Sequence, residues 1–156
     1  MKKIVLSLVL VVGVILLAGC GKVDLSKSSR IVCSKVEDKS SDTTTTILTL
    51  SYDKNEKINN FMVESNVLYK TTMSETAIKL AEKAMKLIGS IPGISFDSKA
   101  GDNSLYYSFS GDIKFLKTLM KQLDKDYDES KVTGDTKSEA LKELTEEGYT
   151  CEDIKN

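Results

Sequence analysis

The chain has 156 residues, 22 basic and 23 acidic side chains, a net charge of -1, and neither histidine nor tryptophan. The absence of histidine excludes His-ligated metal sites and Ser-His-Asp triads. Residues 1–19 contain two lysines and no acidic residue, so the rest of the chain has 20 basic and 23 acidic residues and a net charge of -3. That balance argues against a nucleic-acid partner, which requires a clustered basic face.

The first segment has the features of a bacterial lipoprotein signal peptide. Lys2 and Lys3 precede an apolar stretch over residues 4–17, which is shorter than the roughly 20 residues of a membrane-spanning helix. The sequence Leu-Ala-Gly-Cys at residues 17–20 then matches a lipobox. We predict that residues 1–19 are removed and that Cys20 is lipidated. An uncleaved N-terminal anchor with an incidental cysteine is the alternative.

Lipidation of Cys20 would attach the protein to the outer side of the cell membrane. Stable anchoring takes two or more acyl chains, and a diacylglyceryl group, with palmitate among its acyl chains, supplies them. Residues 20–29 are polar and small and predict a short tether, whose nine flexible residues span roughly 15–18 Å on average. Residues 30–156 have the length of one domain.

Two further cysteines, Cys33 and Cys151, remain in the predicted mature chain. In an exported protein such a leftover pair most simply forms one disulfide bond. The alternative is two free, buried thiols. A metal site is disfavoured, because two cysteines without histidine do not complete a typical ligand set.

Alternating apolar residues predict three strands near the start of the domain. The first covers residues 30–36, and the second covers residues 43–53. In the second, Leu48, Leu50 and Tyr52 alternate with Ile47, Thr49 and Ser51. Turn-forming residues 53–56 lead to a third strand over residues 57–69. These segments predict an antiparallel meander with one buried face.

A helix is predicted next, from a capping box at residues 72–75 to about Ile88. Its apolar residues lie near one face, and Gly89 and Pro92 end it. The apolar stripe is Ala77, Ile78, Ala81, Ala84, Met85 and Ile88. We expect this stripe to pack on the sheet.

The remaining segments predict a hairpin and two helices. Residues 94–98 and 104–110 flank a turn and form the hairpin. Asp112 begins a helical stretch with apolar residues at helical spacing, and a second capping box at residues 136–139 opens a short helix that ends at Gly148. The predicted fold is α+β, with an antiparallel sheet of about four to five strands packed against one long helix and one or two short helices.

The order of these motifs resembles the YehR-like family of small bacterial lipoproteins, a domain family without an assigned function. The resemblance rests on the lipobox, Leu50 to Asp53, the Thr-x-x-Glu box, Gly93-Ile94 before a Tyr-rich strand, and the terminal Leu144 to Cys151. It implies an α+β fold, lipidation at Cys20 and no known catalytic residues. Several members share the pair that matches Cys33 and Cys151 and others lack it, so the fold does not require the disulfide.

An acidic segment over residues 124–135 has the alternating acids that begin a calcium loop. The sixth position is Glu129 where an EF-hand loop needs glycine, and the twelfth is Asp135 where a bidentate glutamate is usual. We therefore interpret the segment as a solvated acidic surface and predict no metal site.

Two other sets of residues, four tyrosines and two acidic pairs, could have either a functional or a purely structural role. Tyr52, Tyr69, Tyr106 and Tyr107 would line a ligand groove if they gathered, but strand aromatics more often pack in a core or across strands. The acidic pairs Glu146-Glu147 and Glu152-Asp153 are read as solvated surface.

We predict no cofactor and no catalytic residue, because phosphate-binding loops and nucleophile motifs do not occur in the sequence. The predicted function is a non-enzymatic, membrane-anchored binding or structural domain of the cell envelope, whose partner is an unknown envelope protein or small ligand. The alternative is an accessory domain or enzyme of the envelope with a site that the sequence does not reveal.

Overall fold

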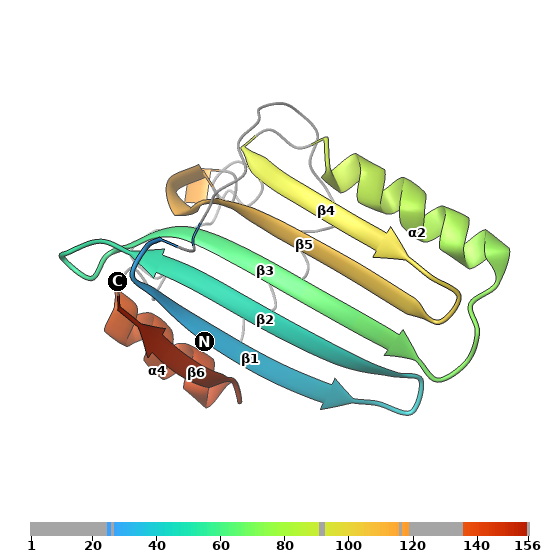
Figure 1. Cartoon of the computed structure of the whole chain (residues 1–156), viewed down its shortest axis with the longest axis horizontal. Coiled ribbons are helices and arrows are strands. Elements are labelled where there is room, and N and C mark those ends of the chain that lie inside the picture. Colours follow the sequence, from blue (N-terminus) through green and yellow to red (C-terminus); the bar gives the residue numbers. More distant parts are fainter. Residues whose placement is uncertain (1–24, 26, 91–92, 116, 119–135, 156) are drawn as a thin grey trace.

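The computed structural model describes residues 25, 27–90, 93–115, 117–118 and 136–155. Six antiparallel strands form one sheet in the order β4-β5-β3-β2-β1-β6 (Figure 1). The strands are β1 (Arg30–Asp38), β2 (Asp42–Tyr52), β3 (Ile58–Tyr69), β4 (Ile94–Ala100), β5 (Ser104–Asp112) and β6 (Thr150–Ile154). The α+β class is confirmed.

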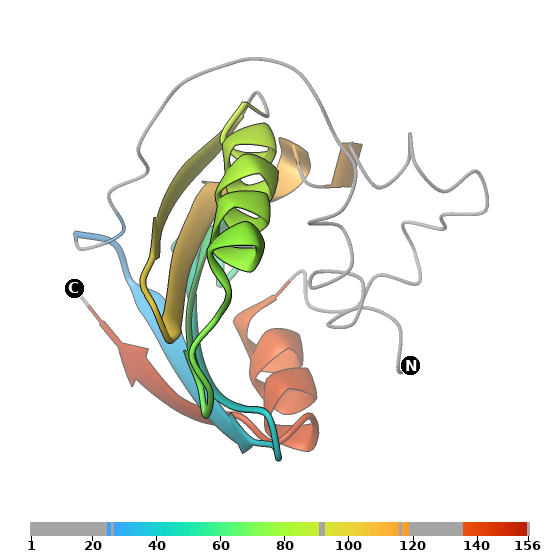
Figure 2. The ribbon, with the colours of Figure 1, turned by 90° about the vertical axis from the view of Figure 1, so that its right-hand side faces the viewer.

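Two helices, α2 (Glu75–Ile88) and α4 (Lys137–Glu146), lie on the same side of the curved sheet (Figure 2). Helix α2 lies beside β4 at one edge, and α4 lies beneath β1 and β6 at the other edge. Residues 113–115 and 117–118 are also helical, as predicted after Asp112. The opposite side of the sheet carries neither α2 nor α4.

Strand register puts the core on the helix-covered face. Phe61 on the central strand β3 lies between Leu50 of β2 and Gly111 of β5, and Leu50 lies opposite Ile31 of β1. Because alternate strand residues point to opposite faces, these positions share one side of the sheet. Phe61 is 1% exposed and its ring meets that of Phe109 edge to face, with centroids 6.0 Å apart.

The predicted count of four to five strands is wrong, because the sequence pattern does not reveal β6. Only Cys151 and Ile154 of this five-residue strand are half-buried, and no alternating apolar pattern marks it in the sequence. Strand β6 instead pairs along β1, from Arg30 opposite Ile154 to Ser34 opposite Thr150. Its place in the sheet therefore depends on backbone pairing rather than on an apolar stripe.

Helix α2 differs from its prediction at both its start and its buried face. The helix begins at Glu75, and the Ala77 amide donates to Ser74 Oγ rather than to the predicted Thr72 cap. Met85 is buried, whereas Ala77 and Ala84 are exposed. The helix lies along the sheet edge, so only part of its apolar stripe reaches the core.

Helix α4 follows its prediction closely. The Glu139 amide donates to Thr136 Oγ1, and the Thr136 amide donates to the Glu139 carboxylate, which completes the predicted capping box. Ala140 and Leu144 are buried against the sheet. Gly148 has a φ of 86°, the left-handed conformation that glycine allows at a helix end.

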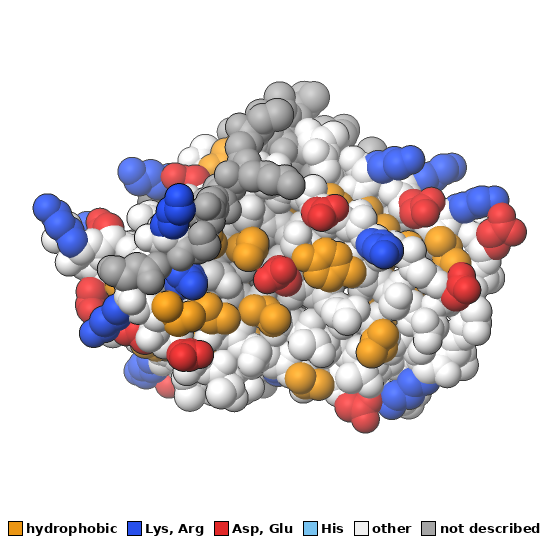
Figure 3. Space-filling view, viewed as in Figure 1, with side chains coloured by type: hydrophobic (Ala, Val, Ile, Leu, Met, Phe, Trp, Pro, Cys, Tyr) orange, Lys and Arg blue, Asp and Glu red, His pale blue; other side chains and the backbone are white. Residues whose placement is uncertain are grey.

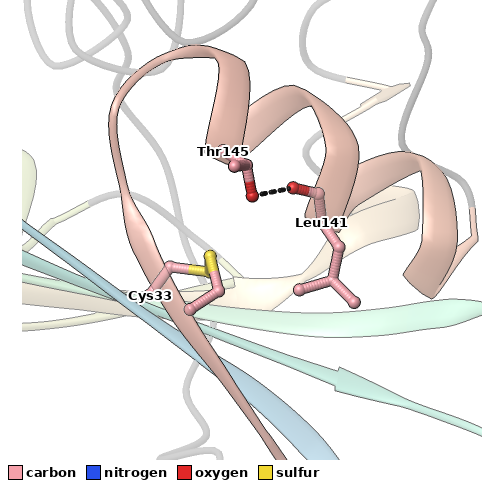
Figure 4. The surroundings of a disulfide bond; sticks show 4 residues. Cys33, Leu141 and Thr145 are labelled. Carbon is pink, nitrogen blue, oxygen red and sulfur yellow. Dashed lines mark hydrogen bonds between the residues drawn. A yellow bond between two sulfur atoms is a disulfide. The ribbon is translucent and has the colours of Figure 1, made fainter.

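Cys33 and Cys151 lie directly opposite each other on β1 and β6, with their sulfur atoms 2.01 Å apart. The bonded pair lies on the helix-covered face, close to Leu141 of α4, whose carbonyl accepts a hydrogen bond from Thr145 Oγ1 (Figure 4). Cys33 is fully buried. The structure thus has the predicted pair as a disulfide rather than as two free thiols.

Candidate functional site

A compact group of interacting polar side chains lies at the end of the sheet where the β2–β3 turn, α4 and β6 meet. We call its four residues, Tyr52, Glu56, Lys137 and Asp153, the end clamp. Lys137 Nζ lies 2.7 Å from Glu56 Oε1 and 3.2 Å from Asp153 Oδ2. Tyr52 Oη donates to Asp153 Oδ1 at 2.5 Å, and Lys137 Nζ lies 5.0 Å from the centre of the Tyr52 ring.

The pKa shifts of Tyr52, Lys137 and Asp153 hold these three groups in their ordinary charge states. Hydrogen bonds to the carboxylates of Glu56 and then Asp153 raise the pKa of Lys137. The hydroxyl of Tyr52, followed by Lys137, lowers the pKa of Asp153, and the same hydrogen bond raises the pKa of Tyr52. Lysines used as nucleophiles or bases need a lowered pKa, so Lys137 is arranged as an ion-pair partner.

Glu56 fixes the turn to the helix through both its backbone and its side chain. Its φ is 60°, the left-handed region that non-glycine residues seldom adopt. The Lys137 amide donates to the Glu56 carbonyl at 2.8 Å, in addition to the carboxylate contact. Asp53 Oδ1 also accepts from the amides of Asn55 and Lys57, which organises the turn. The end clamp therefore joins three segments that are distant in the sequence.

An open pocket of about 350 Å³ lies beside the end clamp. Ser29, Lys54, Lys137 and Lys155 are among the residues that line it, together with Asp53 and Glu56 from the turn. Lys54 and Lys155 are exposed, and neither makes an ion pair with another described residue. The rim of the pocket thus presents unpaired cationic groups, and the end clamp forms part of its wall.

The second candidate surface is the sheet face turned away from α2 and α4, which we call the open face. Register and alternation place Val36 of β1, Leu68 of β3 and Tyr106 of β5 on it. Val36 is 64% and Leu68 49% exposed, and Tyr106 Oη donates to Glu64 Oε1 at 3.1 Å. Figure 3 shows apolar side chains distributed among polar ones on this face.

The four tyrosines do not line one groove. Tyr106 and Tyr107 are neighbours in β5 and point to opposite faces, Tyr107 against the core and Tyr106 on the open face. Tyr52 belongs to the end clamp, and Tyr69 lies at the opposite end of the sheet, where it pairs with Asp42. Tyr107 therefore packs against the core and Tyr106 makes a cross-strand contact with Glu64, as predicted for tyrosines in strands.

The acidic residues of the two predicted pairs differ in their surroundings. Glu146 and Glu152 are exposed, in agreement with a solvated surface, whereas Glu147 is half-buried. Asp153 differs from that prediction, because it accepts from Tyr52 and pairs with Lys137. The sequence carries no local signal for this contact, since Tyr52 lies 101 residues away.

Two of the predicted features fall outside the described residues, namely Cys20 and the acidic segment 124–135. Across the described part of the chain, no group of three His, Cys, Asp or Glu side chains is placed to hold a metal ion. The same part contains no helix that is long and apolar enough to cross a membrane.

No protein-family model, curated protein or solved structure matches this chain. The resemblance to YehR-like lipoproteins therefore stays a prediction from the order of short motifs.

Proposed function

We propose that this protein is a lipid-anchored domain of the bacterial cell envelope, related to the YehR-like lipoproteins, that acts by binding a partner protein rather than by catalysis. Cys20 would carry the diacylglyceryl anchor, and the domain would face away from the cytoplasm. The observation that carries the binding role is the open face, where Val36 and Leu68 are exposed on a sheet whose other face holds the core.

The composition of the open face supports a protein partner. Exposed apolar side chains lie beside hydroxyl and carboxylate groups, such as those of Thr45 and the Tyr106–Glu64 pair. Protein interfaces combine apolar contacts with scattered hydrogen-bonding groups in this way. The end clamp supports a role other than catalysis, because its ionisable groups are paired with one another and its lysine has a raised pKa.

Changing Cys20 to alanine should abolish incorporation of labelled palmitate and move the protein out of the membrane fraction. The substitution removes the thiol to which the diacylglyceryl group would attach, and a polar tether has no other means of stable anchoring. Metabolic labelling and cell fractionation measure the two effects. The matched control is Cys33→Ala/Cys151→Ala, which removes cysteines but should stay labelled and membrane-bound. Undiminished labelling of Cys20→Ala would refute the lipoprotein assignment.

A photo-crosslinking amino acid at Val36 or Leu68 should capture one partner, seen as a product of the same mass from both positions. The matched control position is Leu80 on α2, which is 68% exposed and lies on the opposite side of the sheet. Cells expressing each variant are irradiated, and products are compared on denaturing gels and by mass spectrometry. Equal capture from Leu80, or no product from either strand position, would contradict a binding role for the open face.

A further inference from the structure

The chain leaves the described domain at the same end of the sheet as the end clamp. Tyr52 donates its amide to the Ser29 carbonyl at 3.0 Å, and the Arg30 guanidinium donates to the carbonyls of Ser28 and Leu25. Leu25 is only 5% exposed, so this segment is fixed to the domain. The side chains around Leu25 therefore lie close to the point from which the predicted tether starts.

The length of the remaining tether limits how far this end can lie from the bilayer. Cys20 precedes Leu25 by five residues, and five fully extended residues span at most about 18 Å. A lipid on Cys20 would hold the membrane surface within roughly that distance of Leu25. The domain therefore has to turn this end, which we call the tether-side end, toward the headgroups.

Charged side chains are distributed unevenly between the two ends of the sheet. Segments 25, 27–30, 53–57, 136–137 and 153–155 belong to the tether-side end, and together they carry six cationic and three anionic side chains. The cationic residues are Lys27, Arg30, Lys54, Lys57, Lys137 and Lys155, and the anionic ones are Asp53, Glu56 and Asp153. Figure 3 shows Lys and Arg side chains at this end, where Figure 1 places the β2–β3 turn, and others at the opposite end near α2.

The opposite end has the reverse balance. Its three connections, over residues 38–42, 69–75 and 101–104, are brought together by backbone hydrogen bonds from Lys70 to Ser41 and from Met73 to Asp102. They carry four acidic side chains and two lysines: Asp38, Asp42, Glu75 and Asp102, with Lys39 and Lys70. Within these described segments, the tether-side end is therefore basic and the opposite end is acidic.

We propose that the tether-side end docks on an anionic bilayer, with the strands directed away from the membrane and the open face accessible from the side. This proposal rests on the lipid anchor proposed for Cys20. Of the six cations, Lys137 is held by two carboxylates and Arg30 by backbone carbonyls. The exposed Lys54, Lys57 and Lys155, which make no ion pair within the described part of the chain, would meet the lipid phosphates.

The contribution of each lysine determines how much membrane binding should weaken when that lysine is removed. A lysine close to an anionic membrane surface strengthens binding by about fivefold, and the attraction falls off within a Debye length of about 8–10 Å. Removing three such lysines should weaken binding on the order of a hundredfold. The effect should also disappear at high salt, because counterions screen exposed charges.

The test uses the predicted mature chain, residues 20–156, with Cys20→Ser, so that binding through the domain is measured without the signal peptide or the lipid. Cosedimentation compares vesicles of phosphatidylcholine with vesicles of equal parts phosphatidylcholine and phosphatidylglycerol. The protein should bind only the anionic vesicles, and Lys54→Gln/Lys57→Gln/Lys155→Gln should lose that binding. The matched control is Lys39→Gln/Lys70→Gln at the acidic end, which should bind as before. Thermal unfolding checks that each variant stays folded.

Orientation is measured on the native lipidated protein in vesicles of the same two compositions. Amide hydrogen exchange in residues 53–57 should slow in the anionic vesicles relative to the neutral ones, while exchange in residues 39–41 should not change. Equal binding to both vesicle types, or equal losses in the two sets of lysine variants, would overturn the docking proposal. The proposal of a lipid anchor is tested separately, by palmitate labelling of Cys20→Ala.

Discussion

Replacing both Cys33 and Cys151 by alanine should lower the free energy of unfolding by about 2–5 kcal/mol. The bond closes a loop with a sequence separation of 118 residues, and in the chain-entropy model a loop of that size lies near the upper end of the range. Both ends of the domain are involved, since the bond joins β1 to the last strand, β6. The urea midpoint should fall in a Cys20→Ser background, which removes the third thiol from the measurement.

The loss of stability caused by removing the disulfide should be concentrated at β6, because few other contacts hold this strand. It pairs with β1 alone, and apart from Cys151 only Ile154 is half-buried. Amide exchange in residues 150–154 should therefore accelerate before exchange in β3 does. The end clamp still attaches Asp153 to Tyr52 and Lys137, so the strand should loosen most near Cys151.

The reduced native protein is the control that separates the cross-link from the packing of its side chains. Reduction keeps both sulfur atoms in place and removes only the covalent bond, so the loss of stability should be nearly the same as in the double variant. If the double variant and the reduced protein both match the oxidised protein in urea midpoint, the disulfide would have no stabilising role. Both cysteines are changed together, because a single substitution would leave one buried thiol free to react.

Most strands could be predicted because each one carries its own signal. Leu48 and Leu50 alternate with Thr49 and Ser51, and turn residues at 53–56 separate β2 from β3, so the local pattern and the tertiary position agree. Strand β6 has the sequence TCEDI and takes its position from β1 and from the disulfide. A strand held by long-range pairing leaves no periodic trace in its own residues.

Helix α2 shows a different limit of sequence reasoning. Its apolar stripe correctly predicts an amphipathic helix, but periodicity does not reveal how far the helix reaches over the sheet. At the β4 edge, Met85 is buried while Leu80 stays 68% exposed. The extent of burial is set by the position of the helix, which depends on its contacts with β4.

The end clamp was beyond prediction for a related reason. Lys137 and Asp153 are common surface residue types, and Glu56 lies in a turn where acidic residues are usual. Their contacts depend on the return of the chain to β1 through β6, which places Asp153 opposite Ile31. The lipobox, by contrast, is predicted entirely from a short local sequence. Its Cys20 lies outside the described residues.

Changing Phe61 to alanine should destabilise the protein by about 3–5 kcal/mol, the range for truncating a buried aromatic side chain. Phe61 is 1% exposed at the centre of the sheet, between Leu50 and Gly111. Gly111 has no side chain, and a Cβ at that position would lie 3.4 Å from the Phe61 ring. Truncation would leave a cavity beside Phe109 that the rigid central strands cannot readily close.

The matched control is Leu68→Ala on the same strand. Leu68 points to the open face and is 49% exposed, so its truncation should change the free energy of unfolding by no more than about 0.5 kcal/mol. Chemical denaturation of both variants measures the difference between the two faces of β3. Similar losses at the two positions would contradict the assignment of one face to the core and would imply that the open face is covered within the folded chain. A large loss at Phe61 alone, together with capture of a partner from Leu68, would separate the residues that hold the fold from those that bind.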